Sequence, residues 1–259
     1  MTFLGKARTL LLAGIACLGM PLTTFAAGAG FALEAANNDV SDVASLQRGA
    51  RNFVNYCMGC HTAKYVRYNK LQEDLMLSED QVTENLMFAA KKTDELMTIA
   101  MPSDDAAKWF GQAPPDLTLV SRSRGTDWIY TFLKTFYIDD RAATGTNNLV
   151  LPNASMPHVL WELQGLQEAT FASTVNKDGD VVNNFGNPAE FQEFELVQAG
   201  AMSPEEYDQF VVDLVNFLDW AGTPEQLERQ SLGIWVILFL LVLLAFSYLL
   251  KVEIWKDVK

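Results

Sequence analysis

Hydrophobic residues are concentrated in two runs, one near each end of the chain. The run at 232–250 is 19 residues long and carries no charge. At about 1.5 Å per residue, a helix of this length spans roughly 28 Å, close to the hydrocarbon thickness of a bilayer. Trp235, Tyr248 and Trp255 suit interfacial positions, and lysines follow. The pattern favours a transmembrane helix over a buried core helix, with a linker at 223–231 and a short cytoplasmic tail at 251–259.

The run near the start has the pattern of a secretory signal, which we place at residues 1–27. Lys6 and Arg8 precede a short apolar core, and small residues suited to cleavage follow at 24–27. A lipid anchor on Cys17 is disfavoured, because Gly14 stands where a larger apolar residue is expected. We therefore expect residues 28–222 to form a periplasmic domain, held at a bacterial inner membrane by one C-terminal span.

Helical periodicity predominates between the two runs. The first helix is indicated by apolar residues that share one face, namely Leu46, Ala50, Phe53, Val54 and Cys57. Ser78 is expected to cap a helix of about three turns, and residues 127–137 predict a helix with an aromatic face. Ser203 and Pro204 begin a last helix that stops near Gly222.

The remaining segments are expected to be loops and strands. Turn-forming residues at 101–105 and 111–116 predict loops. Residues 164–201 have strand-like character, with a hairpin over 174–182 around an Asp-Gly turn. The fold class predicted is mainly α, with long loop inserts and one C-terminal transmembrane helix.

Charge narrows the choice of partners. The formal net charge is −13, and loss of the signal would remove two positive charges and leave −15. Nucleic acid is disfavoured as a partner because its phosphates would be repelled. The balance suits a basic protein partner reached by electrostatic steering, although ordinary solubility explains the same charge.

The strongest chemical motif is Cys57-Met58-Gly59-Cys60-His61, the C-x-x-C-H signature of covalent haem attachment. Two thiols three residues apart can add to both vinyl groups of one porphyrin, and His61 is then carried under the ring as an iron ligand. A dithiol redox pair or half of a zinc site are the alternatives. Zinc lacks further ligands, since the only other cysteine and histidine are Cys17 and His158.

Two further positions suit the surroundings of a haem. The carbonyl oxygen of Pro115 could accept the second ring N–H of His61 and orient it, although a plain turn explains the prolines equally well. Haem propionates favour arginine partners. Arg122 is the first choice and Arg124 the second, with ordinary surface arginines as the alternative.

Three residues compete as the sixth iron ligand. Met156, held by a following proline, would give His/Met ligation and a high reduction potential. His158 would give bis-histidine ligation and a lower potential. Met101 also precedes a proline but lies in an acidic loop, and most methionines only fill a core.

Taken in order, these features resemble the cytochrome c1 family over nearly the whole mature chain. The specific marks are the haem motif, Pro114-Pro115-Asp116-Leu117 leading to Arg122, Met156 before Pro157, Trp220-Ala221 before Pro224-Glu225, and the C-terminal span.

The resemblance has consequences for the fold and the haem. It implies a cytochrome c-like domain with one haem c, whose last helix packs near Gly49. It also implies that Met156 binds iron and that Arg122 contacts a propionate. The chain departs from some bacterial members in lacking an extra cysteine pair, so packing must tighten the Met156 loop.

The resemblance also implies a function. The haem would accept one electron from a Rieske iron–sulfur subunit and pass it to a soluble, basic cytochrome c, within a dimeric cytochrome bc1 complex that contains cytochrome b. No substrate bond would be made or broken on this subunit. One alternative is a free-standing, membrane-tethered cytochrome that feeds an oxidase. Another is a haem enzyme or gas sensor with an open iron site.

Overall fold

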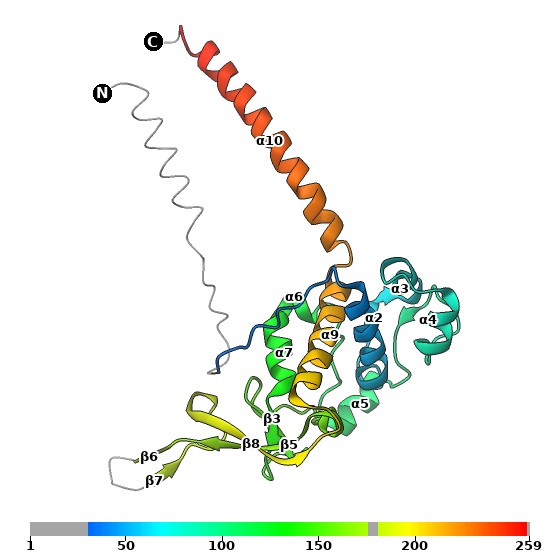
Figure 1. Ribbon diagram of the computed structural model, residues 1–259, viewed down its shortest axis with the longest axis vertical. Coiled ribbons are helices and arrows are strands. Elements are labelled where there is room, and N and C mark those ends of the chain that lie inside the picture. Colours follow the sequence, from blue (N-terminus) through cyan, green and yellow to red (C-terminus); the bar gives the residue numbers. More distant parts are fainter. Residues whose placement is uncertain (1–30, 176–180, 258–259) are drawn as a thin grey trace.

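The computed structural model describes residues 31–175 and 181–257 (Figure 1). The predicted signal at 1–27 lies outside these residues. Helices dominate the described part, and a single long helix, α10, leaves the domain at its C-terminal end (Figure 1). This confirms the predicted fold class, which is mainly α with one C-terminal helix able to span a membrane.

The first and last helices of the domain cross at a glycine. α2 (Val43–Asn52) is capped by Asp42 and continues into a π-helical turn, η1 (Phe53–Cys57). α9 (Pro204–Gly222) begins with the predicted capping box between Ser203 and Glu206. A Cβ atom built on Gly49 would lie only 2.0 Å from the carbonyl oxygen of Asp213 on α9. The predicted close packing of the last helix at Gly49 is therefore confirmed.

The segment after the haem motif forms a small insert beside this helix pair. Strand β1 (Ala63–Arg67) pairs with β2 (Leu96–Met97), and between them lie α3 (Tyr68–Asp74) and α4 (Glu79–Asn85). Ser78 caps α4 with a full capping box, but the helix has two turns rather than the predicted three. The predicted loop at 101–105 is wrong beyond Pro102, because α5 (Ser103–Phe110) begins there.

The aromatic helix is shorter than its periodicity predicts. α6 (Val120–Arg124) leads into α7 (Thr126–Lys134), and the chain then turns into strand β3 (Phe136–Ile138). β3 pairs antiparallel with β4 (Thr146–Asn148), with Phe136 opposite Asn148. The prediction of one helix to residue 137 is wrong, because pairing with β4 takes the last residues into a sheet.

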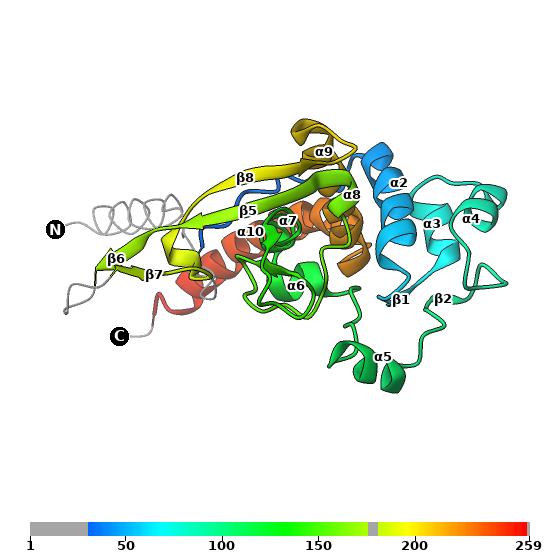
Figure 2. The same ribbon diagram turned by 90° about the horizontal axis from the view of Figure 1, so that it is seen from below.

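A two-stranded arm extends from one end of the domain, and α3 and α4 lie at the other end (Figures 1 and 2). It begins after the short helix α8 (Trp161–Gln164) as β5 (Gly165–Phe171), which pairs with β8 (Phe191–Ala199). β6 (Ser173–Val175) pairs with β7 (Val181–Asn183), and the 3-10 turn η2 (Pro188–Glu190) precedes β8. The predicted hairpin is confirmed, while its Asp-Gly turn lies outside the described residues.

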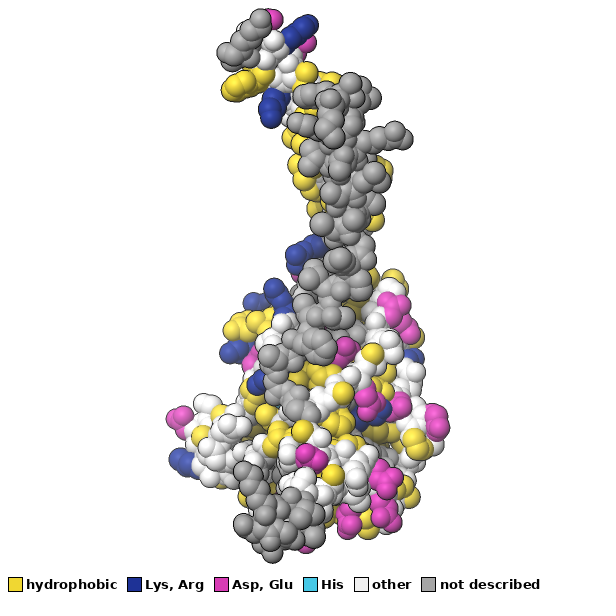
Figure 3. Space-filling view, turned by 90° about the vertical axis from the view of Figure 1, so that its left-hand side faces the viewer, with side chains coloured by type: hydrophobic (Ala, Val, Ile, Leu, Met, Phe, Trp, Pro, Cys, Tyr) yellow, Lys and Arg dark blue, Asp and Glu magenta, His cyan; other side chains and the backbone are white. Residues whose placement is uncertain are grey.

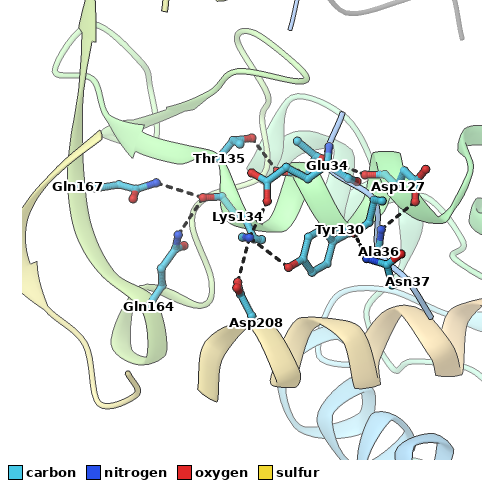
Figure 4. A network of polar contacts seen from close by, with 12 residues as sticks. Glu34, Ala36, Asn37, Asp127, Tyr130, Lys134, Thr135, Gln164, Gln167 and Asp208 are labelled. Atoms are coloured by element: carbon cyan, nitrogen blue, oxygen red, sulfur yellow. Dashed lines mark hydrogen bonds and ion pairs between the residues drawn. The ribbon is translucent and has the colours of Figure 1, made fainter. Parts of the chain in front are cut away.

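A polar network fastens the first described residues to the domain (Figure 4). The backbone N–H of Glu34 donates to Thr131, and that of Ala36 donates to Asp127, both on α7. The ammonium group of Lys134 lies 2.7 Å from Glu34 and 2.9 Å from Asp208 at the start of α9. The N-terminal segment, α7 and α9 are thereby joined through one lysine.

The helix α10 (Gln226–Ile254) includes the whole apolar run at 232–250 and extends beyond it at both ends. None of its most apolar window is buried against the rest of the chain. Only Thr223, Pro224 and Glu225 separate it from α9. A helix that exposes leucine and phenylalanine around its whole circumference is suited to lipid rather than to water.

Candidate haem site

The C-x-x-C-H motif occupies a tight turn at the end of the first helix. In the π-helical turn, the N–H of Met58 donates to the carbonyl of Phe53 over 2.9 Å. The carbonyl of Cys57 then accepts from the N–H groups of both Cys60 and His61, over 3.1 and 2.9 Å. The two thiols and the imidazole therefore come from one turn, as attachment to a single porphyrin requires.

The orientation of His61 is set by the loop that contains the two prolines. Its Nδ1 atom lies 2.7 Å from the carbonyl oxygen of Pro115, so of the two possibilities left open by the sequence, the hydrogen bond rather than a plain turn is observed. With the Nδ1 proton donated there, the lone pair of Nε2 is available to a metal. Burial lowers the pKa of His61, and the Pro115 carbonyl and Asp116 only partly offset this effect. The lowered pKa favours the neutral imidazole, which is the form that binds a metal.

Asp116 holds the proline loop against the segment that follows the motif. Its Oδ2 atom accepts from Thr62 Oγ1 over 2.6 Å and from the Lys64 N–H over 2.7 Å, and its Oδ1 atom accepts from the Thr118 N–H. Burial raises the pKa of this carboxyl, but the hydrogen bonds outweigh burial and leave the pKa lowered. Asp116 thus fixes the distance between the His61 side and the Pro115 side of the site.

The two alternatives for the cysteines find little support. Burial raises the pKa of the Cys57 thiol to about 12. In a reactive dithiol pair, by contrast, the pKa of one of the two thiols is lowered. Within residues 31–175 and 181–257, no group of three or more His, Cys, Asp or Glu side chains could hold a metal ion. A zinc site of the usual four protein ligands is therefore not formed by the described residues.

The two arginines have different surroundings. The guanidinium of Arg124 lies over the ring of Trp128, 5.0 Å from its centroid. Arg122 is exposed on α6, and among the described residues its guanidinium makes no ion pair or hydrogen bond. Its stem lies 3.4 Å from the position of a Cβ on Gly222. Arg122 is therefore free to bind an anionic group, the property that a propionate partner needs.

The three candidates for the sixth ligand also differ. Met156 is half-buried and packs against the main core, as does Cys57. His158 is buried, its ring is stacked on Phe136 at 5.0 Å, and burial lowers its pKa to about 4. Met101 precedes α5 and does not belong to this core. Since His158 contacts the same core through Phe136, membership of this core separates Met156 from Met101 only, and the role of Met156 as ligand stays a prediction.

The sequence does not reveal the role of the polar residues that hold two loops in place: Asp116 bonds the proline loop to Thr62, and the side chains of Asn147 and Asn148 accept from backbone N–H groups of the segment that contains Met156. Asp116 was part of a motif but had no assigned role, and Asn147 and Asn148 were not singled out. The available signal for Asp116 was its place directly after two prolines, where a short acceptor can bond nearby N–H groups. For the asparagines, no local pattern distinguishes a buried hydrogen-bonding pair from an ordinary polar turn.

These features together define a membrane-anchored c-type cytochrome. Comparison with known proteins narrows this class to one family. A model described as the Cytochrome C1 family matches residues 35–258, and the chain belongs to this family.

Individual relatives match over most of their length. The chain is 49% identical to a cytochrome c1 of Allochromatium vinosum, over 97% of this chain and 99% of the relative. It is 42% identical to a protein of Nitrosomonas europaea named ammonia monooxygenase gamma subunit, over 94% of this chain and 96% of the relative. It is 30% identical to a cytochrome c1 of Rhodospirillum rubrum, over 84% and 83%.

Family membership supplies the cofactor and the general function. Cytochrome c1 carries a covalently bound haem c and is the electron-transferring haem subunit of the cytochrome bc1 complex, anchored in a membrane. The residues present fit this group, because Cys57 and Cys60 share one turn with an imidazole whose Nδ1 proton is already engaged. When bound, haem supplies a one-electron couple at its iron.

Proposed function

We propose that this protein accepts single electrons from a Rieske iron–sulfur subunit and passes them to a soluble, basic cytochrome c in the periplasm. It does so within a dimeric bc1 complex that contains cytochrome b. His61 and Met156 would bind the iron of its haem, Cys57 and Cys60 would hold the porphyrin, and Arg122 would neutralise a propionate. The observation that carries this proposal is the 2.7 Å hydrogen bond from His61 to Pro115, in a chain of the cytochrome c1 family.

The chain's own residues act by fixing geometry. The Pro115 carbonyl keeps the imidazole in one tautomer and one orientation, and Asp116 keeps that carbonyl in place. Two protein ligands leave no open position for oxygen or peroxide, so the site is suited to electron transfer rather than to catalysis on a substrate. Little reorganisation is then needed when the charge of the centre changes by one.

The acceptor is proposed to be basic because of the surface charge. The chain has 32 acidic and 19 basic residues, and Asp and Glu side chains are spread over the domain in Figure 3. Opposite charges accelerate encounter, and salt screens them over about 8 Å at physiological ionic strength. We expect the rate of acceptor reduction to fall as salt is added. A rate that does not change with salt would remove the steering part of the proposal.

The first experiment is a reduced-minus-oxidised absorption spectrum of the complete chain, tagged after Lys259 and purified from its native membrane in mild detergent. Bands of b-type haem beside the c-type band are expected, because cytochrome b should accompany this protein. A c-type band alone would favour a free-standing tethered cytochrome. If a monooxygenase copurifies instead, the protein would be a subunit of that enzyme, as the name of the Nitrosomonas relative says of that relative.

The ligand assignment has its own test. The reduced wild-type protein should bind carbon monoxide slowly or not at all, because Met156 fills the sixth position. The Met156→Ala protein should bind it readily, while Met101→Ala serves as the matched control and should behave like the wild type. Rapid binding by the wild type would support an open-site haem protein and contradict the assignment.

A further inference from the structure

The segment between β4 and α8 contains Met156 in a stretch without regular secondary structure. It runs from Leu149 to Leu160 and includes no cysteine, so no disulfide can brace it. Despite this, Leu149, Val150 and Ala154 are buried. The groups that hold this Met156 loop in place are therefore non-covalent, and they can be identified one by one.

Asn148 is fully buried and organises the start of the loop. Its side-chain oxygen accepts from the N–H groups of Val150, over 2.9 Å, and Leu151, over 3.1 Å. Its side-chain nitrogen donates to the carbonyl of Phe132 at the end of α7, over 2.7 Å. One side chain thus ties two backbone groups of the loop to a helix of the core.

Asn147 continues the same arrangement one step closer to Met156. Its side-chain oxygen accepts from the N–H of Asn153 over 2.7 Å and from the N–H of Asn148 over 2.8 Å. Its side-chain nitrogen donates to Asp139 over 3.0 Å, and Asp139 is in turn bonded by Arg141. The last of these loop bonds is made three residues before Met156.

The loop is also held on the far side of Met156. The His158 ring is stacked on Phe136 with an interplanar angle of 4°, and Phe136 lies opposite Asn148 in the β3–β4 pair. Both ends of the stretch from Asn148 to His158 are therefore fixed to the same strand. Met156 lies between these two attachments, so its freedom to move away is limited by the bonds of the asparagines.

We infer that Asn147 and Asn148 are positioning residues for the axial thioether of Met156, in the place of a covalent brace. The inference rests on the proposed function, in which Met156 binds iron. A thioether is a weak, uncharged ligand, so the fraction of time it is bound depends on how well the loop holds it in place. Each buried hydrogen bond contributes up to roughly a factor of ten to such an equilibrium.

The test compares Asn148→Ala and Asn147→Ala with Asn216→Ala in the full-length, haem-containing protein. Asn216 is a suitable control because it is also buried and bonded, to Ser45, but lies at the α2–α9 crossing. Three quantities are measured: the thioether-to-iron charge-transfer absorption of the ferric protein, the midpoint potential, and carbon monoxide binding to the ferrous protein. Thermal unfolding is recorded for all variants.

We expect both loop variants to lose charge-transfer absorption, to have a lower midpoint potential, and to bind carbon monoxide up to roughly tenfold more readily. Asn216→Ala should be destabilised but keep the three wild-type values. Loop variants that are only destabilised, with an unchanged ligand signature, would overturn the inference. If Met156→Ala itself changes none of the three quantities, the ligand assignment fails instead, so the two failures are distinguishable.

If the variants do not fold, a second measurement, made on the wild-type protein, still tests the inference. Amide hydrogen exchange of Val150, Leu151 and Asn153 should be as slow as exchange in the paired β3 and β4 strands, because their N–H groups are bonded to buried side chains. Fast exchange at these three positions in the ferrous protein would overturn the inference without any substitution.

Discussion

Replacing Gly49 with alanine tests whether the α2–α9 crossing holds the domain together. The new Cβ atom would lie 2.0 Å from the Asp213 carbonyl oxygen and 2.7 Å from the Phe217 Cβ, where ordinary contact begins at 3.4 Å. The two helices must therefore separate by about 1.4 Å at this point, and backbone rather than a flexible side chain has to move.

The size of the effect follows from two costs and one gain. Overpacking of a close contact costs about 1–3 kcal/mol, and more where backbone must shift. Separation also strains the bonds of the Asp213 carboxylate to Arg48, at 2.6 Å, and to Ser45, at 2.7 Å. Alanine recovers about 1 kcal/mol of helix propensity relative to glycine. Taking the upper end of the overpacking cost less this recovery, we expect a net loss of about 2 kcal/mol, which corresponds to a fall in Tm of roughly 4–8 °C for a domain of this size.

The assay is thermal unfolding of the haem-containing protein in detergent, followed by circular dichroism. Gly233→Ala on α10 is the matched control, because a Cβ there meets nothing within 4 Å. It should leave the melting temperature of the domain unchanged. A Gly49→Ala protein as stable as the control would refute the reasoning, since the helices would then have tolerated a side chain at their closest approach.

Three smaller effects can be measured in the same way. Ser203→Ala should lower the free energy of unfolding by about 1 kcal/mol, because the N–H of Glu206 in the first turn of α9 loses its acceptor. Trp220→Phe should cost about 1 kcal/mol through loss of the 3.0 Å bond to a carboxylate of α3, and an unchanged melting temperature would contradict this. Burial opposes ionisation of Asp139, but Arg141 and Asn147 outweigh burial and lower its pKa below 3.8. The stability it contributes should be complete well above pH 3.8 and be lost as the pH falls through its lowered pKa, a dependence that Asp139→Asn should lack.

Sequence reasoning succeeded where a single physical requirement dictates the residue. Covalent haem attachment requires two thiols and an imidazole at fixed spacing, and the turn at Cys57 provides them. A close helix crossing requires a missing side chain, and Gly49 is at the crossing. The hydrogen bond from His61 to Pro115 is one of the two possibilities that the prolines allow, and it meets the need of an iron-binding imidazole for an acceptor at its other ring nitrogen.

Sequence reasoning failed where tertiary contacts decided between two local possibilities. Phe136 stands four residues after Phe132, which suits a helix, but its backbone pairs with Asn148 in a sheet. Asp104 and Asp105 suit a turn, but acidic residues after a proline equally suit the first turn of a helix, and here they begin α5. The positions of Asn147 and Asn148 could not be predicted, because their partners are distant in sequence or depend on the loop that they organise.

The three residues between α9 and α10 limit how far the haem domain can travel. Three residues span at most about 10 Å, and the N–H of Gln226 already bonds back to Thr223 over 3.0 Å. A domain on so short a tether keeps a nearly constant height above the bilayer. Under the proposed function, redox partners would therefore have to come to the domain, and their diffusion and docking, rather than a swing of the domain itself, would limit the rate of electron transfer.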